Sequence, residues 1–146
     1  MIVTLTIEHA LHIVYKMRED DKREVMASSR AEHLMDFAQE CMYYGGYCLI
    51  AKDGEPVAMA GIARQWSGVG NAWMVGTERL QHHMVEASRM IRKEINKPEW
   101  RRLQAWSSAN HTTAHVWLRH IGFVNAHTLK GFGKDGGDFY LFEKFN

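Results

Sequence analysis

Apolar and polar residues alternate along the chain in a way that predicts short strands separated by amphipathic helices. Residues 2–5 (IVTL) are typical of a strand. Thr6 can then cap a helix, and Ser29, followed three residues later by a glutamate, matches the capping box of a second helix that ends at the glycine pair 45–46. The charged stretch 18–24 (REDDKRE) between them is predicted to be a loop or a solvated helix end. The apolar face of the first helix would comprise Ala10, Ile13, Val14 and Met17.

The middle of the chain carries the clearest pattern. Two apolar runs in the segment 46–63 flank the dipeptide Asp53-Gly54, which favours a tight hairpin with positive φ at both central residues. Thr77 follows another strand and can cap a long amphipathic helix. The elements expected from there on are a strand at 69–77, a helix at 78–97, a strand at 101–108, a helix at 110–121, and strands within 124–132 and 138–145.

This order predicts the fold class. A long helix joins the strands 69–77 and 101–108, so they should pair in parallel, whereas hairpins make the remaining pairs antiparallel. We therefore expect one α+β domain over residues 1–146. It would contain a mixed, mostly antiparallel twisted sheet with a central parallel pair and helices on both faces.

Charge, composition and residue spacing exclude several classes of partner. The net charge of +1 gives no overall field for nucleic acid or an anionic membrane, so neither is expected as a partner. No apolar run reaches the roughly 18 residues of a membrane span, and the N-terminus does not read as a signal peptide, which predicts a cytoplasmic protein. Cys41 and Cys48 lack metal-site spacing and are expected to be reduced core residues. His111 and His115 have the spacing of a ligand pair, but no third ligand is evident, so no metal is expected.

The segment 110–123 (NHTTAHVWLRHIGF), together with the element order, resembles the GNAT family of N-acyltransferases. In that family the helix after the fifth strand begins with an Asn cap and ends in Gly-Phe, as Asn110 and the pair 122–123 do here. Gly122 can take the left-handed conformation that ends a helix, and Phe123 can then turn into the core. Ala114, Trp117 and Leu118 occupy the intervening positions of the motif.

The resemblance implies an acyl-CoA site between the two parallel strands, with acetyl-CoA as cosubstrate. The backbone of Met74 and Val75 would pair with the pantetheine arm, and the turn from Gly76 to Leu80 would hold the diphosphate. The residues that the resemblance assigns to the cofactor are Met74, Val75, Gly76, Thr77, Arg79, Asn110 and Trp117.

The chain departs from the family at two places. The phosphate turn normally contains several glycines, whereas VGTERLQHHM has only Gly76, and Glu78 adds a negative charge. Leu118 stands where many members have the tyrosine that protonates the leaving thiolate. With no evident general base, His111 at the head of the helix is the weak catalytic candidate, and we expect it on the surface.

Two hypotheses follow. The departures resemble the GNAT-like internal virion proteins of short-tailed bacteriophages, which implies a partner-binding or assembly role with a degenerate acyl-CoA site, in the host cytoplasm or the virion. Self-association or binding to other virion proteins would use an exposed aromatic sheet edge comprising Phe139, Tyr140, Phe142 and Phe145. The alternative is an active acetyl-CoA-dependent N-acetyltransferase that acts on an amine.

Overall fold

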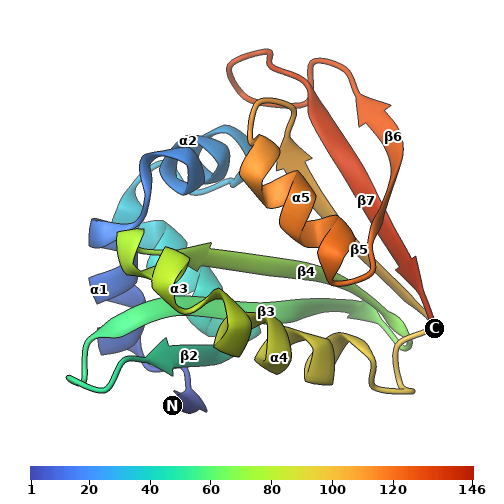
Figure 1. The fold of residues 1–146 in the computed structure, drawn as a ribbon. Helices are drawn as coiled ribbons and strands as arrows, with labels where there is room; N and C mark the ends of the chain where they lie inside the picture. The colour runs from blue at the N-terminus through green and yellow to red at the C-terminus, as the bar shows by residue number, and fades with distance from the viewer.

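A single seven-stranded sheet organises residues 1–146 in the computed structural model (Figure 1). The strand order is β1-β2-β3-β4-β5-β7-β6. Only β4 and β5 are parallel, and all other neighbours are antiparallel, so the predicted fold class is confirmed. The strands are β1 (Ile2–Thr4), β2 (Tyr47–Ile50), β3 (Pro56–Trp66), β4 (Val69–Gly76), β5 (Arg102–Ser108), β6 (Val124–Leu129) and β7 (Phe139–Phe145).

Helices cover both faces of this sheet. One apolar core cluster joins α1, α3 and the sheet, and another joins the sheet to α4 and α5, which lie in front of it in Figure 1. Cys41 and Cys48 are both free and buried in the first cluster, as expected. None of the helices has the length and apolar character of a membrane span. The helices are α1 (Ile7–Lys16), α2 (Glu19–Ser28), α3 (Leu34–Tyr44), the 3₁₀ helix η1 (Glu78–His82), α4 (Met84–Ile95) and α5 (Thr112–His120).

The N-terminal third differs from the prediction. The charged stretch 18–24 lies mostly within α2, which buries Asp21 and Val25. Ser29 ends α2 instead of beginning the next helix, and α3 starts only at Leu34. The reason is local, because the Ser29 hydroxyl accepts the N–H of Ala31 and donates to Glu40, so it is not available to cap a helix.

The helix predicted at 78–97 is divided. Thr77 caps η1 through its side-chain oxygen, which accepts the N–H of Arg79. The chain then leaves helical geometry at His83, where φ is −127° and ψ is 17°, before α4 begins. The helix predicted at 110–121 also starts later, because His111 and not Asn110 is its N-cap residue, and Asn110 is an exposed turn residue.

The glycine predictions are confirmed in part. Gly122 has a φ of 111° and ends α5, and Phe123 is 1% exposed. Gly54 has a φ of 88° in the β2–β3 hairpin, but Asp53 does not have positive φ. The prediction of a two-residue turn with positive φ at both positions was therefore wrong.

The prediction of an exposed aromatic edge on the last strand was also wrong. Phe139 and Phe142 are buried because β7 lies between β5 and β6. The true outer strand on this side is β6, which is exposed along almost all of its length.

Candidate functional site

Strands β4 and β5 separate after a short ladder. Their parallel pairing covers only three positions and ends at Asn71 and Gln104, and the two strands diverge from there in Figure 1. The N–H of Thr77 donates to Val57 on β3, so alternation directs the backbone groups of Gly76 and Met74 toward the gap. The backbone of Val75, assigned with Met74 to the cofactor, is directed toward β3 by the same alternation.

The segment around the start of α2 closes the far end of this gap on the β4 side. The N–H of Gly76 donates to the Asp21 carboxylate over 2.9 Å, and the carbonyl of Gly76 accepts the N–H of Arg18 over 2.9 Å. The Arg18 guanidinium also binds the same carboxylate through both of its oxygens. Both backbone groups of Gly76 are therefore occupied by this segment.

The same helix reaches β5. The Glu24 carboxylate accepts the Ser107 hydroxyl over 2.5 Å and the N–H of Ser108 over 2.6 Å. Asp21 and Glu24, one helical turn apart, thus connect the diverging ends of β4 and β5. We call this set of contacts the α2 bridge, comprising Arg18, Asp21, Glu24, Gly76, Ser107 and Ser108.

His111 lies between the two carboxylates of the α2 bridge. Its Nε2 is 3.6 Å from Asp21, and its Nδ1 is 3.5 Å from Glu24 without a well-aligned hydrogen bond. The side chain is buried, contrary to the surface position predicted for it, because it packs against Asp21 and Glu24 of α2. Burial lowers the pKa of His111, but the neighbouring carboxylates of Glu24 and Asp21 outweigh it and raise that pKa above its usual range.

The pKa of Asp21 is raised as well. Burial is the larger cause, and it outweighs the opposing effects of Arg18, the Gly76 N–H and His111. His115, one turn further along α5, instead bonds through Nε2 to the carbonyl of Ser108 over 2.8 Å, and burial lowers its pKa. The two histidines therefore serve different partners. The structure contains no group of three or more His, Cys, Asp or Glu side chains arranged to hold a metal ion.

The turn after β4 is closed by hydrogen bonds between its own residues. The N–H of Arg79 donates to the Thr77 hydroxyl, and the N–H of Leu80 donates to the Thr77 carbonyl. Leu80 is fully buried, and a side chain at Gly76 would collide with it, since an added Cβ would lie 2.6 Å from a Leu80 methyl carbon. The turn is thus filled by Leu80 and closed by internal hydrogen bonds.

Arg79 is engaged outside the gap. Its guanidinium binds Asp53 over 3.0 Å and Glu55 over 2.5 Å, on the β2–β3 hairpin. The hydrogen bond from Arg79 lowers the pKa of Glu55, so both ends of this contact stay charged at neutral pH.

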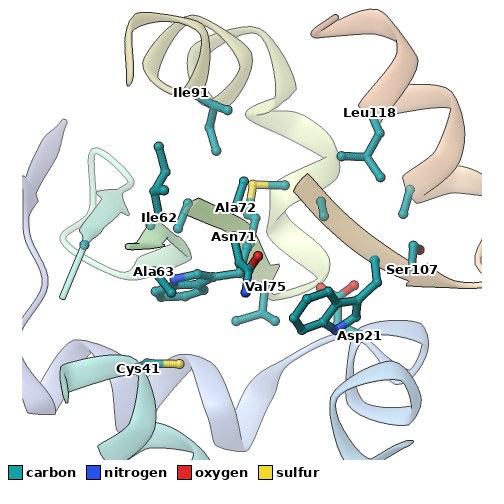
Figure 2. A pocket seen from close by; sticks show the side chains of 18 of the residues that line it. Asp21, Cys41, Ile62, Ala63, Asn71, Ala72, Val75, Ile91, Ser107 and Leu118 are labelled. Carbon is teal, nitrogen blue, oxygen red and sulfur yellow. The ribbon is translucent and has the colours of Figure 1, made fainter. Parts of the chain in front are cut away.

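A cavity of about 690 Å³ passes through the gap between the strands. Figure 2 shows Ile91 of α4 on one side, Cys41 of α3 on the other, and Asn71, Ala72 and Val75 of β4 between them. Of the residues predicted to form the site, Met74, Val75, His111 and Trp117 line this cavity, whereas Gly76, Thr77, Arg79 and Asn110 do not. Trp117 is held in place because its indole N–H donates to Ser88 over 2.9 Å.

Sequence reasoning missed the acidic residues of the α2 bridge. They sit in a run of charges that resembles a solvated surface, and their partners on β4 and β5 are more than fifty residues away along the chain. The i, i+3 spacing of Asp21 and Glu24 is the one local sign that they share a helix face.

Comparison of the whole structure identifies the fold. The chain superposes on an acetyltransferase of the GNAT family from Bacillus anthracis with a TM-score of 0.70 and 13% identity, covering 99% of this chain and 93% of that one. It superposes on the F149G mutant of SpeG spermidine N-acetyltransferase from Vibrio cholerae with a TM-score of 0.73, 8% identity and coverages of 99% and 92%. It superposes on ribosomal-protein-alanine N-acetyltransferase from Brucella melitensis with a TM-score of 0.66 and 16% identity, covering 100% of this chain and 99% of that one.

These likenesses show that the chain has the GNAT acyltransferase fold. At such low identities they establish the fold alone. Neither a protein-family model nor a curated protein sequence matches the chain.

Proposed function

We propose that this chain is a GNAT-fold protein with a degenerate acyl-CoA site, which works by binding a protein partner and not by acyl transfer. One observation carries the proposal: the turn after β4 has no N–H donors left for a diphosphate at Gly76, Arg79 or Leu80. Those N–H groups donate to Asp21, to the Thr77 hydroxyl and to the Thr77 carbonyl, respectively.

The residues of this turn do not fit a diphosphate. An anion at a helix start needs free N–H groups and a nearby positive charge. Here the Leu80 side chain fills the turn, the Arg79 guanidinium is shared between Asp53 and Glu55, and Glu78 adds an exposed negative charge. The acyl-CoA cosubstrate implied by the fold therefore lacks its strongest anchor.

The resemblance to phage internal virion proteins supports the partner-binding role. In this proposal the chain is made in the host cytoplasm and joins other virion proteins or a second copy of itself. The surface that favours such contacts is the outer strand β6, where Val124 is 61% exposed. An outer strand with free backbone groups can pair with a strand of another chain.

The oligomeric state of the protein tests whether β6 is a contact surface. If β6 mediates self-association, light scattering after size-exclusion chromatography gives a dimer or larger species for the wild type and a monomer for Val124→Lys, because a charge on the outer strand opposes edge pairing. Val85→Lys on α4, which replaces another exposed valine, is the matched control and leaves the mass unchanged. A wild type that is monomeric at all concentrations, and that does not co-purify with any virion protein through β6, contradicts this part of the proposal.

The degenerate site is tested by comparing two ligands calorimetrically. S-acetylpantetheine carries the arm of acetyl-CoA without its diphosphate. If the turn cannot hold a diphosphate, acetyl-CoA binds no better than S-acetylpantetheine, and neither binds below about 100 μM, which corresponds to about 5.5 kcal/mol. Low-micromolar binding of acetyl-CoA with a preference of about 100-fold over S-acetylpantetheine would contradict the proposal.

A second candidate function is N-acetyl transfer to an amine. The cavity favours it, since it passes between the diverging strands and brings together the side chains of Met74, Trp117 and His111. An acetyl-transfer assay against a panel of amines tests this function. If His111 transfers a proton, turnover falls by about 10²-fold in His111→Gln, and His120→Gln at the exposed end of α5 has no effect.

A further inference from the structure

One carboxylate that lines the cavity has no counter-charge. Glu40 of α3 is partly buried, and its Oε2 accepts the Ser29 hydroxyl over 2.9 Å. Its Oε1 makes no hydrogen bond within the chain but remains accessible, and the side chain forms no ion pair. A carboxylate that is partly withdrawn from water is normally paired with a positive charge. Glu40 therefore offers an accessible, unpaired carboxylate at the wall of the cavity.

The other charged groups on this side of the sheet are matched with one another. Arg18 and Asp21 bind each other within the α2 bridge. The Glu24 carboxylate accepts two donors from β5, and His111 lies between it and Asp21. The two positive groups are thus held by the α2 bridge, and neither forms an ion pair with Glu40.

Aromatic side chains flank Glu40 on its own helix. The residues of α3 that line the cavity lie three or four positions apart, on one face of the helix: Phe37, Glu40, Cys41 and Tyr44. Cys41 marks this face in Figure 2. Burial, and after it the negative charge of Glu40, raises the pKa of the Cys41 thiol to about 12, so the thiol stays neutral. Tyr44 is 47% exposed, so the cavity opens to solvent at this end of α3.

Trp73 of β4 adds a third ring to this wall. Its side chain lines the cavity and packs against the core cluster that contains Phe37 and Cys41. A Cβ added to Gly61 would lie 2.9 Å from the ring and 2.6 Å from the Gly45 carbonyl, so the ring is held against β3 beside the end of α3. Its indole N–H is inaccessible and makes no hydrogen bond. The cavity therefore meets the carbon atoms of the ring and not its donor.

These surroundings favour a cation that carries no hydrogen-bond donors. A primary ammonium has three N–H donors, each of which needs an acceptor. The carboxylates of the α2 bridge already bind donors of the chain, which leaves Glu40 as the one unmatched carboxylate on this side. A quaternary ammonium needs no acceptor, because a nearby negative charge and aromatic rings around its methyl groups stabilise it.

We propose that the α3-facing half of the cavity binds a quaternary ammonium group. The cationic head lies among the rings of Phe37, Tyr44 and Trp73, with the Glu40 carboxylate as its counter-charge. The cavity volume of about 690 Å³ is in the range of small-molecule sites. A quaternary nitrogen has no N–H that could be acetylated, so this is a binding site that depends neither on acyl-CoA nor on amine acetylation.

Choline is the probe, and two analogues of the same shape or charge separate its features. The carbon analogue has a tert-butyl group in place of the trimethylammonium group, so it has the shape without the charge. Ethanolamine keeps the charge but has N–H donors in place of the methyl groups. In calorimetry, choline should bind with a Kd below about 1 mM and about tenfold more tightly than either analogue.

Each other outcome of this comparison overturns the proposal. Equal binding of the carbon analogue would reduce the site to an apolar cavity. Equal or tighter binding of ethanolamine would make it a site for a primary amine, as the second candidate function requires. Absence of saturable choline binding would show that no ammonium site exists.

The indole N–H signals of the ¹⁵N-labelled protein locate the bound choline. The five tryptophans give five signals, and Trp73→Phe identifies the one that belongs to Trp73. Choline should shift the Trp73 signal in a saturable manner, because the cation lies against its ring. The Trp117 signal should stay in place, since its N–H donates to Ser88 on α4. A shift of Trp117 without a shift of Trp73 would place choline in the other half of the cavity and contradict the proposal.

Glu40→Gln removes the counter-charge at constant size and keeps an acceptor for the Ser29 hydroxyl. We expect it to weaken choline binding about tenfold and to leave binding of the carbon analogue unchanged. Glu94→Gln is the matched control and retains wild-type binding, because Glu94 lines the same cavity from α4 and its charge is balanced by Lys97. Full choline binding in Glu40→Gln would overturn the proposal.

A second pair of variants tests the aromatic contact at the opening of the cavity. Tyr44→Leu removes the ring and should weaken choline binding about fivefold, whereas Tyr44→Phe keeps the ring and should bind as the wild type does. Because Tyr44 is about half exposed, neither change disturbs the core. Equal binding in the two variants would exclude the aromatic contact and contradict the proposed site.

Discussion

The two ends of the β4–β5 strand pair are built in different ways. At the closed end, residues 69–71 and 102–104 form a regular parallel ladder, in which the Leu103 side chain is fully buried. At the open end the ladder stops, and side chains of α2 hold the strands at a distance. Backbone pairing determines the fold at the first end, whereas long-range side-chain contacts determine the candidate site at the second.

The comparison is tested most strongly by removing the centre of the α2 bridge. Asp21→Ala leaves the Arg18 guanidinium and the Gly76 N–H without their buried acceptor, and we expect it to lower the free energy of unfolding by about 3–5 kcal/mol. Asp20→Ala is the matched control, since Asp20 is exposed and pairs with Arg23 at the same i, i+3 spacing. That variant should change stability by no more than about 0.5 kcal/mol in urea denaturation. Equal losses in the two variants would show that the bridge does not stabilise the open end.

Matched leucine truncations compare the packing at the two ends. Leu103→Ala creates a void in the closed core and should cost about 2–5 kcal/mol. Leu118 borders the existing cavity, so Leu118→Ala enlarges a space that is already present and should cost about 1 kcal/mol less. Thermal unfolding of both variants checks the order, and a larger loss for Leu118→Ala would contradict it.

The open end should also respond to pH through His111. A pKa that folding raises contributes stability below the unfolded value of about 6.5, and this contribution is lost as the pH rises through the folded pKa. The groups facing His111 are Asp21, Glu24 and Arg18 from the α2 segment and His115 from its own helix. His111→Gln should therefore be about 1 kcal/mol less stable than wild type near pH 5.5, with a gap that narrows toward pH 8.5.

The control for this pH series is His120→Gln, at the exposed end of the same helix. Its stability should follow that of the wild type at every pH in chemical denaturation. A gap between wild type and His111→Gln that widens as the pH rises would show that His111 is neutral when folded.

The smallest effect is expected at the turn beyond the open end. Arg79 is 37% exposed, and its contacts with Asp53 and Glu55 are surface ion pairs. Arg79→Ala should therefore lower the denaturation midpoint less than Asp21→Ala, Leu103→Ala or His111→Gln does. Arg89→Ala on α4 is the control, and denaturation of both variants in low and high salt separates the ion-pair contribution. A loss in Arg79→Ala as large as that in Asp21→Ala would mean that the turn is a structural element and not a surface contact.

The sequence predicted the closed end better than the open end. Apolar runs, the βαβ spacing and Gly122 are local signals, and they were sufficient for the strand order around the parallel pair and for the end of α5. The resemblance to GNAT proteins also predicted a site in the gap between β4 and β5. Met74, His111 and Trp117 line a cavity there.

The failures share a physical cause. The role of Asp21 depends on Gly76, which lies 55 positions away, and no local pattern reports such a contact. Ser29 had the correct spacing for a capping box but found other partners in Ala31 and Glu40. Asn71 and Trp73 resembled ordinary strand residues, and only the three-dimensional arrangement shows that their polar atoms lack partners.

The hydrogen bond between the Gly76 N–H and Asp21 offers a way to observe the motion of α2 alone. This N–H lies at the end of a central strand, yet its protection depends on a side chain from another segment and not on the sheet ladder. In native-state hydrogen exchange, Gly76 should open at a lower free energy than Thr77, whose N–H bonds to β3. The difference between these adjacent amides would measure how often α2 lifts from the sheet while the rest of the molecule stays folded.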